Sequence, residues 1–163
     1  MNLRYTVLVA FNFAMTACAA KTAYQSASAF PSASAASLAV VGRWALIAMV
    51  RNGEDVTRGG VTQNEATRYY TFKSDQTFLI QLGDSVTERG TWSTDTTASP
   101  KHFDHTPDQN GKPGPLVPGI YQVGSDVLKI SFLPPNAGNK RPVQFEAAAS
   151  NGSFLFIMKR IAP

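Results

Sequence analysis

Short segments of alternating hydrophobic and polar residues follow one another from residue 39 to the end of the chain. Such segments, separated by Gly, Pro, Asn and Asp, are typical of antiparallel β-structure, and none of them keeps a helical period. The pattern predicts nine strands. They are expected near residues 41–50, 67–73, 77–82, 86–93, 101–105, 119–123, 127–133, 143–147 and 154–160.

Most of these segments have one clearly apolar face, because successive side chains of a strand point to opposite sides. The residues predicted to face a common interior are Trp44, Leu46, Ala48, Val50, Phe78, Ile80, Leu82, Leu128, Ile130, Phe132, Phe154, Phe156 and Met158. Eight or nine strands without helices must protect their edges, and closure does so. The sequence therefore predicts an all-β, antiparallel up-and-down barrel, with a two-sheet β-sandwich as the alternative.

Two longer loops interrupt the strands, at residues 51–65 and 106–118. The second contains four prolines, which fix the backbone and lack an N–H donor. It is expected to be stiff and to cover one mouth of the barrel.

The first eighteen residues have the layout of a secretory signal peptide, with Arg4 before an apolar run over residues 5–15 and small residues after it. The run is shorter than the roughly 20 residues of a membrane-spanning helix. Residues 15–18, MTAC, resemble a bacterial lipobox, in which the cysteine is lipidated. Cys18 is the only cysteine, so no intrachain disulfide and no thiolate metal cluster can form.

These features predict an exported protein of the periplasm or outer membrane, held at the membrane only through a lipid on Cys18. Ordinary signal cleavage near this position is the alternative. Residues 19–38 are rich in Ala and Ser and predict a linker with a reach of about 25 Å. The expected organisation is a signal peptide over residues 1–18, a linker over 19–38 and one barrel domain over 39–163.

Charge and composition narrow the function further. Hydrophobic residues make up 44% of the 163 residues and charged residues 16%, enough apolar surface for one packed domain. The net charge of +4 is spread thinly along the chain. Because nucleic-acid binding normally shows a clustered basic surface, it is not expected here.

Several short motifs resemble a family of small exported domains of unknown function, abundant in planctomycete genomes and grouped with lipocalin-like barrels. The resemblance covers residues 41–160. It is carried by Gly42-Arg43-Trp44, Gly90-Thr91-Trp92, Pro100-Lys101, Phe103-Asp104, Gly119-Ile120-Tyr121, Gly124 with Asp126 and Leu128, Arg141-Pro142, Phe145 and Lys159-Arg160. It implies a lipocalin-like barrel and no established activity.

The resemblance also implies a structural role for Gly42, Trp44 and Arg160. Lipocalins typically place a Gly-x-Trp on the first strand and a basic side chain of the last strand over the indole. By strand parity Arg160 shares the face of Phe156 and Met158. A cation–π contact with Trp44, of about 0.5–2 kcal/mol, is expected.

The predicted interior suggests a ligand site. Its tentative lining is Arg68, Tyr70, Phe72, Phe78, Ile80, Glu88, Tyr121 and Phe156. Arg68 and Glu88 share inward parity with apolar neighbours, and three readings stay open for them: an ion pair, contact with a ligand, or exposure at the strand ends.

No catalytic set, cofactor motif or metal site is expected. His102 and Asp104 should face one side of their strand and His105 the other, so they cannot converge on a metal. The sequence therefore predicts a non-enzymatic module with two alternative functions: binding of a small apolar ligand, or a structural or protein-interaction role in the cell envelope. An apolar pocket of about 300 Å³ or more would favour the ligand, and a filled interior would favour the second function.

Overall fold

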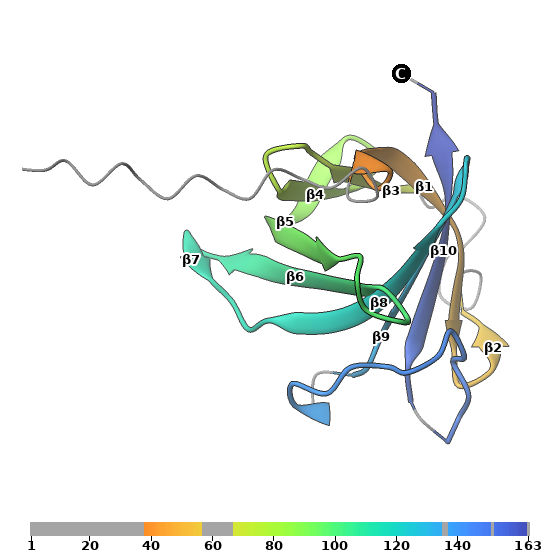
Figure 1. The fold of residues 1–163 in the computed structure, drawn as a ribbon. Helices are drawn as coiled ribbons and strands as arrows, with labels where there is room; N and C mark the ends of the chain where they lie inside the picture. Colours follow the sequence, from red (N-terminus) through yellow and green to blue (C-terminus); the bar gives the residue numbers. More distant parts are fainter. Residues whose placement is uncertain (1–37, 57–66, 135–136, 151, 163) are drawn as a thin grey trace, which may run out of the picture. The chain divides into compact units, whose positions relative to one another are not determined.

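A computed structural model describes residues 38–56, 67–134, 137–150 and 152–162. Within these residues all of the strand pairs are antiparallel (Figure 1). The strands are β1 (Gly42–Arg51), β2 (Glu54–Asp55), β3 (Arg68–Phe72), β4 (Thr77–Leu82), β5 (Ser85–Asp95), β6 (His102–Gln109), β7 (Lys112–Pro113), β8 (Val117–Val123), β9 (Val127–Phe132) and β10 (Phe154–Ile161).

Eight of the strands close into a barrel. They pair in the order β1-β3-β4-β5-β6-β8-β9-β10, and β10 pairs again with β1, from Arg43 opposite Ile161 to Arg51 opposite Phe154. Figure 1 shows β1 and β10 running side by side. Closure leaves none of the eight strands with a free edge. The predicted up-and-down, lipocalin-like barrel is confirmed, and the alternative β-sandwich is wrong.

The predicted strand over residues 143–147 is wrong. Residues 141–148 form bends and irregular backbone outside the ladder. The reason is that β9 already pairs with β10 over six residue pairs, from Phe132 opposite Phe154 to Val127 opposite Lys159. The ring is complete without a ninth barrel strand, so this segment has no edge to join. The eight other predicted strands coincide with the barrel strands to within a few residues at their ends.

A β-bulge in β1 corrects the predicted inward face of that strand. Leu46 lies opposite Met158 and Ala48 opposite Ile157, so Ile47 is an extra residue without a partner. An extra residue reverses the alternation beyond it. Met49 therefore faces the interior, whereas Ala48 and Val50, which the simple alternation placed inside, do not.

The proline-containing segment after β6 forms a hairpin arm. β6 continues to Gln109, and the chain turns at Asn110 and Gly111, whose φ angles are 56° and 79°. Two successive positive φ values are those of a tight hairpin turn, and Asp108 supports it by accepting a hydrogen bond from the Gly111 amide at 2.6 Å. The chain returns as β7. Figure 1 shows this arm projecting past the other strands, so part of the expected loop is a regular hairpin.

One end of the barrel is packed solid, and we call it the closed end. It contains residues that are all at most 5% exposed, namely Val40, Trp44, Trp92, Phe103, Tyr121, Leu128 and Met158. The strand registers place the other ends of β1, β3, β4, β5, β6, β8, β9 and β10 together. We call this second end the open end.

Arg160 and Trp44 join β10 to β1 at the closed end. The guanidinium carbon of Arg160 lies 4.1 Å from the centre of the Trp44 ring, as the sequence predicts. Arg160 also donates hydrogen bonds to the carbonyls of Val41 at 3.0 Å and Ala39 at 2.6 Å. A Cβ at Gly42, which has φ +141°, would lie 2.7 Å from Arg160, so the glycine makes room for the guanidinium.

Candidate functional site: a cavity at the open end

The barrel holds a cavity of about 540 Å³. Its wall is mainly apolar and aromatic. Besides the Tyr70 hydroxyl, its polar side chains are Arg68, Thr87, Glu88 and His105. The remaining lining residues are Met49, Tyr70, Phe72, Phe78, Ile80, Phe103, Val117, Ile130, Phe132, Leu133, Phe154, Phe156 and Met158. A concave apolar site with few polar groups is the usual form of a small-molecule pocket.

The structure brings together seven of the eight residues singled out from the sequence. Arg68, Tyr70, Phe72, Phe78, Ile80, Glu88 and Phe156 line the cavity. Tyr121 does not: it is 1% exposed at the closed end, with its ring 6.3 Å from that of Phe103. β8 runs from the open to the closed end, so Val117 faces the cavity where Tyr121 was expected.

Arg68 and Glu88 stand at the polar side of the cavity, on β3 and β5. Arg68 is exposed and Glu88 is partly buried. Burial raises the pKa of the Glu88 carboxyl, and the positive charge of Arg68 opposes this rise. Burial likewise raises the pKa of Tyr70, with Arg68 again acting in the opposite direction. In the described part of the chain no ion pair joins Arg68 to Glu88, and Arg68 instead forms a side-chain hydrogen bond with Tyr70.

His105 is the titratable lining residue that the sequence analysis did not assign to the cavity. Its ring lies 5.6 Å from that of Phe78 and 4.8 Å from that of Phe132, edge to face in both cases. Burial lowers the pKa of His105 to about 4, although the charge of Asp104 opposes the shift. The alternation that buries Phe103 also turns His105 inward. That signal was present in the sequence, but it served only to separate His105 from His102.

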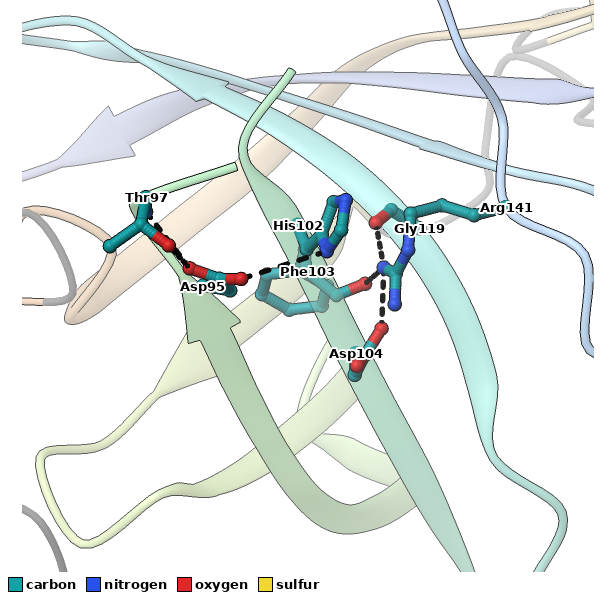
Figure 2. A network of polar contacts seen from close by, with 7 residues as sticks. All are labelled: Asp95, Thr97, His102, Phe103, Asp104, Gly119 and Arg141. Carbon is teal, nitrogen blue, oxygen red and sulfur yellow. Dashed lines mark hydrogen bonds and ion pairs between the residues drawn. The ribbon is translucent and has the colours of Figure 1, made fainter. Parts of the chain in front are cut away.

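The opposite face of β6 carries a polar network on the outside of the barrel (Figure 2). Asp104 forms an ion pair with Arg141, with 2.6 Å between Oδ1 and Nη1. Arg141 also donates hydrogen bonds to the carbonyls of Phe103 and Gly119, on β6 and β8. His102 lies 4.0 Å from Asp95. Through these contacts, Arg141 holds the segment of residues 137–150 against β6 and β8.

The directions of the side chains on β6 also decide whether they can share a metal ion. His102 and Asp104 point outward to separate partners, while His105 faces the cavity. Among the residues that the structure describes, no group of three or more His, Cys, Asp or Glu side chains is placed to hold a metal ion.

Acidification is expected to destabilise the protein through His105. Its pKa is about 4 in the folded chain and 6.5 in the reference state, so the unfolded chain binds the proton more tightly. The stabilising effect of the neutral ring is complete above pH 6.5 and is lost as the pH falls toward 4. The free energy of unfolding of the wild type should fall over this window by on the order of 2 kcal/mol more than that of His105→Phe. Urea unfolding curves of both proteins measure it, and parallel pH profiles would contradict it.

Comparisons with protein-family models, with curated proteins and with solved structures each found no match. The resemblance to the exported-domain family therefore stays a prediction. Cys18, the predicted signal peptide and residues 19–37 of the linker lie outside the described residues. Within the described residues, no helix is both long and apolar enough to span a membrane.

Proposed function

We propose that this barrel binds a small, largely apolar molecule in the cavity of its open end. The observation that supports the proposal is the cavity itself. Its volume of about 540 Å³ lies within the range of about 300–1,000 Å³ typical of small-molecule sites. A purely structural module would need no such space, and filling it with side chains would add stability.

The proposed function is non-catalytic. The Thr87 hydroxyl donates a hydrogen bond to the Ile80 carbonyl at 3.2 Å, and the neighbours of the His105 ring are two phenyl rings. A nucleophile needs a base within hydrogen-bond reach, and these two groups do not form such a pair. The polar groups of the cavity are therefore better suited to orienting a bound molecule than to transforming it.

We also propose that the domain acts in the cell envelope, without nucleic-acid partners. The signal-like residues 1–18 and the lipobox-like position of Cys18 support export and a lipid anchor. Radiolabelled palmitate incorporation into the full chain, and its loss in Cys18→Ser, tests the anchor separately from ligand binding. Secretion without label would favour ordinary signal cleavage.

Narrowing the cavity is expected to weaken binding of a neutral dye. N-phenyl-1-naphthylamine, which fluoresces in apolar surroundings, should bind the wild type. Ile80→Trp adds a large ring to the cavity wall and should weaken dye binding at least tenfold, whereas the same substitution at Ile47, 52% exposed on β1, should leave it unchanged. Fluorescence titration gives the dissociation constants, and thermal unfolding shows that both variants fold.

Equal dye binding by folded Ile80→Trp and Ile47→Trp would contradict the proposal, as would a wild type that does not bind the dye. Native mass spectrometry of the protein purified from its own host then looks for a co-purified small molecule. The added mass of this molecule should be present in the wild type and absent from Ile80→Trp.

A further inference from the structure

His105 is a polar group in the apolar wall of the cavity. It lies on β6 between Phe78 of β4 and Phe132 of β9, and all three side chains line the cavity. Within the part of the chain that the structure describes, no hydrogen bond from the protein engages the His105 imidazole. The ring is partly buried, and the two phenyl rings beside it offer no hydrogen-bonding atoms, whereas a buried polar group is normally hydrogen-bonded. A bound molecule is in a position to supply it.

The charges around the cavity limit what that molecule is. Burial holds His105 neutral at physiological pH, so its ring carries no charge to attract an anion. At the cavity edge, Arg68 and Glu88 carry opposite charges. Asp104, next to His105 on β6, points outward to Arg141. The cavity wall at His105 thus offers hydrogen bonding without an uncompensated charge, which suits an uncharged molecule.

We infer that the cavity takes an uncharged, largely apolar molecule with a hydroxyl group, and that this hydroxyl forms a hydrogen bond with the His105 imidazole. The inference rests on the proposed function and specifies its ligand class. A neutral imidazole has one nitrogen that donates and one that accepts. A hydroxyl group also does both, so it satisfies whichever nitrogen faces the cavity. The surrounding phenyl rings then contact the apolar body of the ligand.

Two ligands that differ only by a hydroxyl group test the inference. Naphthalene and 2-naphthol compete with N-phenyl-1-naphthylamine for the full chain, and each displacement curve gives a dissociation constant. The quantity of interest is the ratio of the naphthalene constant to the naphthol constant. His105→Phe should lower this ratio about three- to tenfold relative to the wild type, which is the effect of losing one hydrogen bond.

Two further variants separate hydrogen bonding from structural damage. His105→Gln keeps a group that both donates and accepts, so it should retain most of the wild-type ratio. His102→Phe makes the same change as His105→Phe on the outer face of the same strand, and it should leave the ratio unchanged. Thermal unfolding of each variant shows that it folds.

The inference and the proposed function fail in different ways. If both compounds displace the dye but the ratio is the same in the wild type, His105→Phe and His105→Gln, the hydroxyl contact is wrong while the binding site stands. If 2-naphthoate binds more tightly than 2-naphthol and Arg68→Ala removes the difference, the ligand is an anion and the inference is overturned. If neither compound nor the dye binds the wild type, the proposed function itself fails.

Discussion

Trp44→Ala, at the closed end, is expected to lower the free energy of unfolding by about 3–5 kcal/mol. The Trp44 side chain is 0% exposed, and its Nε1 donates a hydrogen bond to the Val40 carbonyl at 2.9 Å. Truncation leaves a large void. It also removes the ring over which Arg160 lies, so the guanidinium loses the cation–π contact that joins β1 to β10.

Urea unfolding followed by circular dichroism measures this loss. Two further variants separate the contribution of the buried ring from that of the Arg160 contacts. Trp44→Phe keeps a ring and should cost less than half as much. Arg160→Met keeps the aliphatic stem but removes the cation–π contact and the donors to Val41 and Ala39. It should cost about 1–3 kcal/mol. A folded Trp44→Ala protein within 1 kcal/mol of the wild type would show that the closed end does not hold the barrel together.

The barrel was predictable because its local signals agree. Strand alternation, compact turns such as Asp75 with Gln76, and the Gly-x-Trp pair with a terminal arginine all indicate one closed sheet. The bulge at Ile47 was not predictable, since an extra residue in one strand is defined only by its partner strand. The segment of residues 143–147 alternates well enough to look like a strand, yet the closed ring left it no place.

The candidate site was predictable in its composition but not in its position along the barrel axis. Parity separates inside from outside, so it identified Arg68, Tyr70 and Phe156. It does not say which end of a strand lies beside a cavity and which lies in solid core. Tyr121 and Val117 share a face of β8 but lie at opposite ends of the barrel for this reason. The contacts of Arg141 with Asp104 and with the carbonyls of Phe103 and Gly119 join residues far apart in sequence, and no local pattern encodes them.

This difference between the two ends leads to the second large effect, in Phe103→Ala. Phe103 is 1% exposed and has ring contacts with Phe72, Trp92, Tyr121 and Phe132, at centroid distances of 5.4–6.3 Å. Tight packing on most sides prevents collapse around the deleted ring, so the free energy of unfolding should fall by about 3–5 kcal/mol.

Phe156→Ala is the matched control, because it deletes the same ring from a partly buried position on the cavity wall. Its unfolding free energy should fall by about 1–2 kcal/mol less than that of Phe103→Ala, since the Phe156 ring is less buried than the Phe103 ring. Both rings line the cavity, but Phe103 is 1% exposed whereas Phe156 is only partly buried, so dye affinity should respond more strongly to Phe156→Ala. Stability and binding would then be separated along the axis, with the closed end keeping the barrel shut and the open end holding the ligand. Equal losses of stability and of dye affinity in the two variants would show that the ends are not specialised in this way.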